Sequence, residues 1–208
     1  MADWVILGAG NLIGDLLDAI QVNGDQILTV VINQDLPQSL GLKIENMRIP
    51  LTSCETYIPN KETQHIFGFL SPNKEAFLRE LEKYHLQFGN LIHSRAYLPT
   101  STRLGVGNYV GPNVTLGSFV SLKDFNFLNR ASSIGHDTTI ESFTHVGPAA
   151  TVCGNCRIGS KVYVGAGATI IDGLQIGDQI TLGAGAVVTK NLLDSGIYVG
   201  IPARPKII

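Results

Sequence analysis

Residues 132–140, SSIGHDTTI, place a histidine and an aspartate side by side in a run of small and aliphatic residues. An imidazole takes up and releases protons near neutral pH, and a carboxylate beside it fixes its tautomer and raises its basicity. His136 and Asp137 are therefore candidates for general base catalysis of a group transfer. Neighbouring side chains on a strand point to opposite faces, so their contact requires a turn here. A merely solvated polar pair is the alternative.

An aliphatic residue recurs at every sixth position from Ile92 to Val188. An α-helix has a period of about 3.6 residues and a half-buried strand a period of about two, so neither explains this pattern. A period of six predicts a parallel β-helix in which each hexapeptide forms one side of a coil. Three sides make a coil of 18 residues, which places His136 directly beneath Gly154 and Ala166 directly beneath Ala184.

The first 90 residues have a different pattern. Residues 4–10, 27–33 and 64–70 predict strands, whereas residues 11–20 and 73–86 have the spacing and composition of helices. This order predicts a small Rossmann-like α/β domain with a parallel sheet over residues 1–90. The β-helix and a C-terminal tail then occupy residues 91–208.

Three glycines follow the first predicted strand as G-x-G-x-x-x-G, at positions 8, 10 and 14. Such a turn brings backbone N–H groups close to a phosphate at a helix N-terminus, but tight packing of strand against helix also selects glycine. The candidate substrate-binding residues here and after the second strand are Gly8, Gly10, Asn11, Asn33 and Asp35.

Two of the three cysteines form the segment C-G-N-C at Cys153 and Cys156. A zinc site needs a second pair of ligands, and a thioredoxin-like motif needs a helix start after a strand. The sequence shows neither, so both cysteines are interpreted as small side chains of the repeat. We expect no metal.

The composition limits the partners. The chain has 208 residues, is 44% hydrophobic and 15% charged, and has a formal net charge of −2. No apolar run approaches the roughly 20 residues of a membrane span, and no basic segment of a secretory signal is present. The absence of a Lys/Arg block argues against nucleic acid or an anionic membrane as the main partner. We expect a cytoplasmic protein.

The segment N-x-x-x-x-I-G-H-D at residues 129–137, a Rossmann-like start and closing segments LGAGAVVTKNL and YVGIPAR together resemble the PglD/NeuD-type sugar acetyltransferases. The resemblance covers essentially the whole chain. It implies a left-handed β-helix, a homotrimer with active sites between neighbouring β-helices, and acetyl-CoA as co-substrate. It also implies N-acetylation of a nucleotide-linked amino sugar, although the first glycine turn and the Asn33-Gln34-Asp35 segment depart from the family pattern.

The resemblance also assigns roles to single residues. His136 matches the catalytic base, Asp137 the acidic residue that polarises it, and Asn129 a polar residue near the acceptor sugar. His145 and Gly154 match positions that hold the thioester end of acetyl-CoA, and Ala166 and Ala184 match backbone contacts along its pantetheine arm. His145 as a surface or interface histidine remains the alternative. Lys190 and Arg204 are candidates to meet the CoA phosphates, although basic residues near a C-terminus are common.

Other functions are compatible with parts of this pattern. O-acetylation of a sugar hydroxyl, such as that of sialic acid, is the nearest alternative. A zinc enzyme of the γ-type carbonic anhydrase kind needs three converging histidines, and only His136 and His145 lie within the coils. A non-enzymatic nucleotide-binding scaffold is the remaining alternative, and it predicts that replacing His136 leaves any activity intact.

Overall fold

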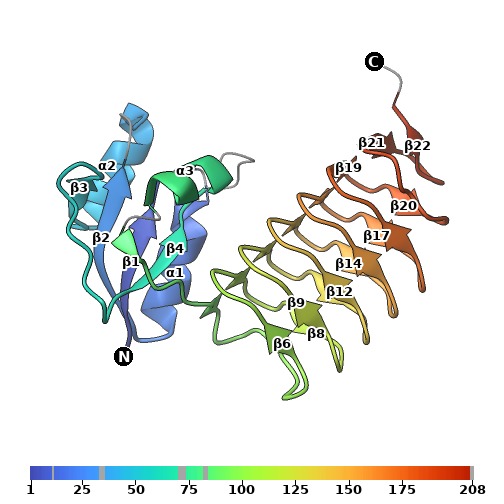
Figure 1. The fold of residues 1–208 in the computed structure, drawn as a ribbon, viewed down its shortest axis with the longest axis horizontal. Helices are drawn as coiled ribbons and strands as arrows, with labels where there is room; N and C mark the ends of the chain where they lie inside the picture. The colour runs from blue at the N-terminus through green and yellow to red at the C-terminus, as the bar shows by residue number, and fades with distance from the viewer. Residues whose placement is uncertain (11, 33–35, 70–73, 82–83, 207–208) are drawn as a thin grey trace. The chain divides into compact units, whose positions relative to one another are not determined.

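The computed structural model describes residues 1–10, 12–32, 36–69, 74–81 and 84–206. The chain divides into two compact units, Met1–Ser94 and Arg95–Ile208 (Figure 1). The fold predicted from the sequence, a small α/β region followed by a parallel β-helix, is confirmed. None of the helices in the described ranges is long and apolar enough to cross a membrane.

The first unit is built around a four-stranded parallel sheet with the strand order β3-β2-β1-β4. Its largest helix, α1, buries the apolar side chains Ile13, Leu16, Leu17 and Ile20. In chain order the elements are β1 (Asp3–Leu7), α1 (Ile13–Val22), β2 (Gln26–Ile32), α2 (Gln38–Asn46), β3 (Leu51–Ser53), β4 (Gln64–Phe67), α3 (Lys74–Leu81) and β5 (Leu91–Ile92).

The sequence pattern misplaces some boundaries in this unit. The predicted helix over residues 73–86 is shorter, because α3 ends at Leu81 and His85 has a left-handed backbone with φ of 51°. Helix α2 and strand β3 were not predicted. The sequence of α2, QSLGLKIEN, contains a glycine and only three large apolar residues, so its periodic signal is weak.

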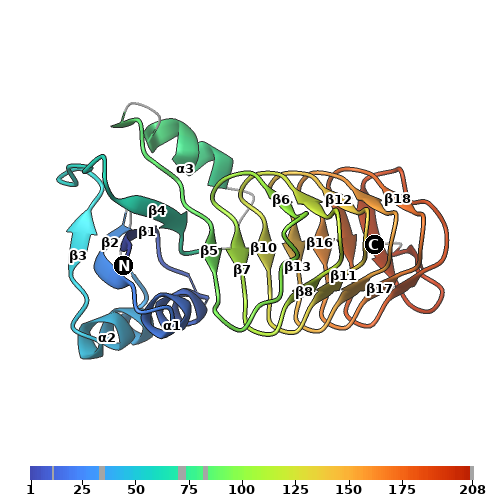
Figure 2. The same ribbon diagram turned by 90° about the horizontal axis from the view of Figure 1, so that it is seen from below.

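The second unit consists of short parallel strands that stack coil on coil in three sheets (Figures 1 and 2). The first sheet contains β7 (Tyr109–Val110), β10 (Phe127–Leu128), β13 (His145–Val146), β16 (Tyr163–Val164), β19 (Ile180–Leu182), β21 (Gly196–Val199) and the antiparallel β22 (Arg204–Pro205). The second contains β8 (Thr115–Leu116), β11 (Ser133–Ile134), β14 (Thr151–Val152), β17 (Thr169–Ile170) and β20 (Val187–Val188). The third contains β6 (Arg103–Leu104), β9 (Ser121–Leu122), β12 (Thr139–Ile140), β15 (Arg157–Ile158) and β18 (Gln175–Ile176).

The six-residue period sets both the core and the register of this unit. Every sixth residue from Val110 to Val188 is an aliphatic side chain that is at most 1% exposed. Strands pair at a spacing of 18 residues, as Phe127 does with His145 and His145 with Tyr163. The predicted stacking of residues 18 apart is therefore confirmed.

Candidate active site

His136 and Asp137 lie at the corner where the chain passes from β11 to β12. Asp137 has a left-handed backbone with φ of 55°, and its N–H donates to the carbonyl of Ser118 on the preceding coil at 2.9 Å. This is the turn that the pair requires. It lets the two adjacent side chains meet, with 2.8 Å between Nδ1 of His136 and Oδ2 of Asp137.

The imidazole of His136 is accessible to a substrate. The side chains of His136 and Asp137 are 60% and 51% exposed. Because an ionised carboxylate only accepts hydrogen bonds, Nδ1 is the donor in the contact with Asp137. Nε2 then carries the lone pair, which is the arrangement that a general base needs.

Gly154 lies on the next coil, directly beside the imidazole. A Cβ atom added to Gly154 would stand 2.8 Å from Nε2 of His136 and 2.9 Å from its Cε1. The space at Nε2 therefore depends on a residue without a side chain. The N–H of Gly154 donates to Oδ1 of Asp172 at 3.2 Å.

Asp172 is a residue of this corner that the sequence did not single out. Residues 18 apart lie above one another on neighbouring coils, as Gly154 does above His136. Asp172 therefore lies above Gly154, and Lys190 lies above Asp172, in agreement with the pairing of β17 with β20. We define the His136 corner as Ser118, His136, Gly154, Asp172 and Lys190. The 18-residue spacing that links His136 to Gly154 is also the signal in the sequence that identifies Asp172.

The two cysteines near this corner both have thiols with a raised pKa. Burial raises the pKa of the Cys153 thiol, and the nearby Asp172 carboxylate raises it further. Burial also raises the pKa of Cys156, whose side chain is fully buried. Zinc binds thiolates, and the described residues contain no group of three or more His, Cys, Asp or Glu side chains that could hold a metal ion.

Three of the other residues predicted to contact acetyl-CoA or sugar lie at a different corner. Ala166 and Ala184 are exposed in the turns that follow β16 and β19, and Asn129 directly follows β10. The side chain of Asn129 is 5% exposed, and its Oδ1 accepts a hydrogen bond from the N–H of Arg130 at 2.7 Å. We call these three residues the Ala166 corner. One side of the coil, the second sheet, separates it from the His136 corner.

His145 lies in β13 on the outer face of the first sheet and is only 7% exposed. Its ring packs between two aromatic rings at the same position of neighbouring coils, with centroid distances of 5.5 Å to Phe127 and 4.7 Å to Tyr163. Tyr109 extends this column at 4.4 Å from Phe127. His145 therefore has a packing role in the aromatic column.

Close packing requires glycine at positions 8 and 10 of the first turn, whereas Gly14 in α1 has open space around it. A Cβ at Gly8, where φ is 74°, would lie 2.6 Å from the ring of Phe69, and one at Gly10 would lie 3.0 Å from Cβ of Phe69. The N–H groups of Gly8 and Gly10 donate to the carbonyls of Val31 and Gly68. The other candidates for substrate binding, Asn11, Asn33 and Asp35, lie outside the described residues.

The two basic candidates for the CoA phosphates are both exposed. Lys190 belongs to the His136 corner, two residues after β20. Arg204 begins β22, and its guanidinium donates to the carbonyl of Ala203 at 3.0 Å. The structure does not place the two side chains in contact with a common partner among the described residues.

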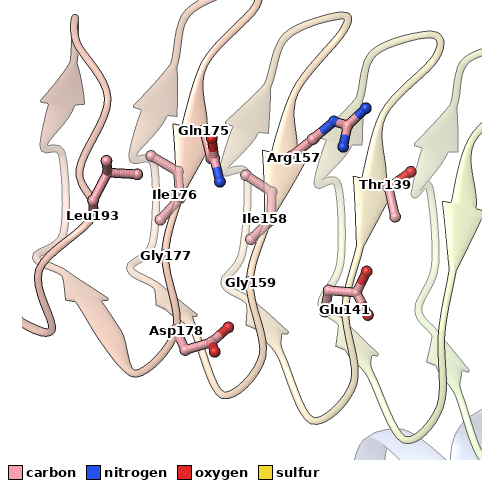
Figure 3. Close-up of a pocket in the computed structure, with 10 residues that line it drawn as sticks. All are labelled: Thr139, Glu141, Arg157, Ile158, Gly159, Gln175, Ile176, Gly177, Asp178 and Leu193. Carbon is pink, nitrogen blue, oxygen red and sulfur yellow. The ribbon is translucent and has the colours of Figure 1, made fainter.

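A groove lies on the outer face of the third sheet, over β12, β15 and β18 (Figure 3). Its polar lining comes from Thr139, Glu141, Arg157, Gln175 and Asp178, and Figure 3 shows Arg157 and Gln175 on neighbouring strands. None of the predicted site residues is among the described residues that line it. The His136 corner is thus an exposed turn at the edge of a sheet, separate from this groove.

Comparison with known proteins supports this architecture. Residues 155–190 match the family model described as bacterial transferase hexapeptide (six repeats). No curated protein sequence is a significant match to the chain.

Solved structures match over nearly the whole chain. A histidine-to-alanine variant of GDP-perosamine N-acetyltransferase from Caulobacter crescentus, in complex with CoA and GDP-perosamine, has 22% identity and a TM-score of 0.88, with 100% of this chain and 98% of that chain covered. The acetyltransferase domain of PglB from Neisseria gonorrhoeae has 23% identity and a TM-score of 0.87, covering 99% and 100%. WeeI from Acinetobacter baumannii has 22% identity and a TM-score of 0.84, covering 99% and 100%.

At these identities the likeness establishes the fold. The predicted resemblance is therefore confirmed for the architecture and for the hexapeptide repeat: the chain has the fold shared by these acetyltransferase structures, with hexapeptide repeats of the bacterial transferase type.

Proposed function

We propose that the protein is an acetyl-CoA-dependent N-acetyltransferase that acts on a nucleotide-linked amino sugar. The observation that carries the proposal is the imidazole of His136, held by Asp137 at 2.8 Å and bordered by a glycine on the next coil. A similar fold with bound CoA and GDP-perosamine supports the choice of donor and acceptor class.

His136 acts as the general base through Nε2. The amine nitrogen of the sugar attacks the thioester carbonyl carbon, and Nε2 accepts the proton that the nitrogen loses. The carbon–sulfur bond then breaks, the acetyl group stays on nitrogen as an amide, and the proton leaves with the CoA thiol. Proton transfer by a positioned base contributes roughly 10²–10⁴-fold in rate.

Asp137 orients the base and stabilises its protonated form. Its carboxylate accepts the hydrogen bond from Nδ1, which fixes the tautomer that exposes the lone pair of Nε2. Both side chains are more than half exposed, so water competes for this contact. The contribution of Asp137 is therefore smaller than that of His136.

Gly154 provides the N–H donor for the thioester oxygen. It is positioned one coil above His136, and it has no side chain to exclude the carbonyl group from Nε2. A donor aimed at the developing oxyanion is worth about 3–4 kcal/mol in enzymes where one has been removed.

The functional assembly is a homotrimer. The Ala166 corner and the His136 corner are separated by one side of the coil. A side of six residues at 3.3 Å each spans about 20 Å. A second copy that brings its Ala166 corner beside the His136 corner completes the site. The pantetheine arm then runs along the exposed Ala166 and Ala184.

The first unit binds the nucleotide part of the acceptor. The glycine turn follows β1 at the carboxyl end of a parallel sheet, where such folds bind nucleotides. The N–H groups of Gly8 and Gly10 are already used within the unit, so a phosphate depends on other groups, for which Asn11, Asn33 and Asp35 are the candidates. Lys190 and Arg204, which are both exposed, contact the CoA phosphates.

The test is a screen of UDP-, dTDP-, GDP- and CMP-linked amino sugars with acetyl-CoA, in which free thiol is measured. One of these sugars is expected to release thiol and gain the mass of one acetyl group on its amine. Acetylation at a hydroxyl would support the O-acetyltransferase alternative. Binding of nucleotide sugars without any transfer would support the scaffold alternative.

A further inference from the structure

The N–H group of Gly154 has a partner in the free protein. It donates to Oδ1 of Asp172 at 3.2 Å, across one coil of 18 residues. Asp172 is exposed and Gly154 is buried. The proposed donor for the thioester oxygen is therefore held by a carboxylate at the surface of the His136 corner.

Equivalent bonds occur at another corner of the coil, away from His136. Oδ1 of Asp178 accepts from the N–H of Ser160 at 2.7 Å, and Oδ1 of Asp124 accepts from the N–H of Val106 at 2.9 Å. Each of these links residues 18 apart, as the bond of Gly154 does. The bond at Gly154 is longer, and the same glycine adjoins Nε2 of His136.

The Asp172 carboxylate and a thioester oxygen need the same hydrogen. An N–H group that already donates to a carboxylate has little left to offer a second acceptor. A carboxylate beside this N–H also disfavours the negative charge that develops on the thioester oxygen during transfer. Productive binding of acetyl-CoA thus requires the Asp172 side chain to release Gly154.

We propose that Asp172 is a positioning residue whose carboxylate occupies the N–H of Gly154 until the oxygen of a thioester displaces that carboxylate. This inference rests on the proposed acetyl transfer. CoA has no carbonyl group at sulfur, so it cannot compete for the N–H, and the bond of Asp172 to Gly154 forms again once the acetyl group has left. Asp172 therefore lowers the affinity for acetyl-CoA and leaves the affinity for CoA unchanged.

The test is the binding of acetyl-CoA and of CoA, measured by titration calorimetry without acceptor sugar. Asp172→Ala frees the N–H and should tighten acetyl-CoA binding about three- to tenfold, because hydrogen bonds to exposed charged groups are weak net contributors. CoA binding should not change. Asp172→Asn keeps a neutral acceptor of the same size and should give an intermediate gain. Asp178→Ala removes a structural bond of the same kind and should change neither affinity.

Two other outcomes would contradict the role of Asp172, and a third would contradict the proposed function. Equal tightening of both ligands in Asp172→Ala would mean simple repulsion of the CoA phosphates, and an unchanged or weakened acetyl-CoA affinity would mean that Asp172 does not compete. Either result overturns the inference and leaves the proposed function in place. If the unaltered protein binds neither ligand, the proposed function fails, and this inference fails with it.

Discussion

Two histidines, one in each unit, make polar contacts of similar length in opposite surroundings. In the β-helix, the His136 side chain is 60% exposed and contacts Asp137 through Nδ1 at 2.8 Å. In the first unit, His65 is 0% exposed, with Nε2 at 2.7 Å from the hydroxyl of Tyr57 and Nδ1 at 2.9 Å from the carbonyl of Gln87.

The difference shows which histidine can accept a proton from a substrate. Nδ1 of His65 donates to a carbonyl, and Nε2 accepts from Tyr57, so both nitrogens are engaged. Burial lowers the pKa of His65 and raises the pKa of Tyr57, which keeps both side chains neutral. His65 thus has both ring nitrogens bonded within the first unit, whereas His136 has an accessible lone pair on Nε2.

Among variants of the residues that surround these two histidines, the largest effect on kcat is expected from filling the space beside Nε2 of His136. Gly154→Ala places a methyl group 2.8 Å from that nitrogen. The exposed imidazole rotates away, so the coils should remain folded while kcat falls about 100-fold, the loss that a misplacement of about 1 Å causes. Steady-state thiol release and thermal unfolding followed by circular dichroism measure the two effects.

Gly41→Ala is the matched control for this substitution. It adds the same methyl group within α2, where nothing beyond the neighbouring residues and the helix's own backbone lies within 4 Å of the new carbon. The control should keep its activity and gain some helix stability. Full activity in Gly154→Ala would show that the space at Nε2 is not used by a substrate.

A smaller effect is expected from the partner of the base. Asp137→Asn keeps a residue that tolerates the left-handed backbone but removes the carboxylate that orients Nδ1. The rate should fall about tenfold, because the pair is exposed and water replaces part of the contact. Asp137→Gly, which suits the turn without any partner, should give the same loss of kcat. Unchanged kcat in both variants would mean that Asp137 serves only the turn and does not assist His136.

The smallest effect is a dependence of stability on pH in the first unit. The pKa of His65 is lowered in the folded state, so the unfolded chain binds a proton at higher pH than the folded chain does. Stability is therefore fully present above the unfolded pKa of about 6.5 and declines as pH falls below it. His65→Gln, which stays neutral, should be less stable overall but lose this dependence.

Fluorescence of Trp4, the only tryptophan, reports unfolding of this unit because the residue lies in β1. Denaturant midpoints at pH 7.5 and 5.5 should differ in the unaltered protein. They should lie closer together in the glutamine variant. Equal shifts in both proteins would assign the dependence to other groups.

The sequence predicted the second unit far better than the first. A period of six over 16 hexapeptides determines which side chains are buried and which residues stack, because each coil repeats the environment of the last. The sequence alone therefore predicts that His136 lies beneath Gly154. The first unit has no repeat, and α2 and β3 depend on tertiary packing that a weak local pattern does not record.

Within the site, the pattern identified the positions but missed an interaction between side chain and backbone. The bond from Gly154 to Asp172 depends on the rotamer of a surface carboxylate, which the period does not determine. The burial of His145 was also missed, since an outward strand position is normally exposed. Only the stacking of Phe127 and Tyr163 on either side explains it.

The central claim is that His136 transfers the proton during acetylation of a sugar amine. The most direct measurement is kcat for acetyl transfer by His136→Ala, with the acceptor that the screen identifies and with thiol and acetylated sugar both measured. We expect a loss of at least about 100-fold in both products, with the coils still folded by circular dichroism. Retained transfer in the folded variant would contradict it and remove His136 from the mechanism.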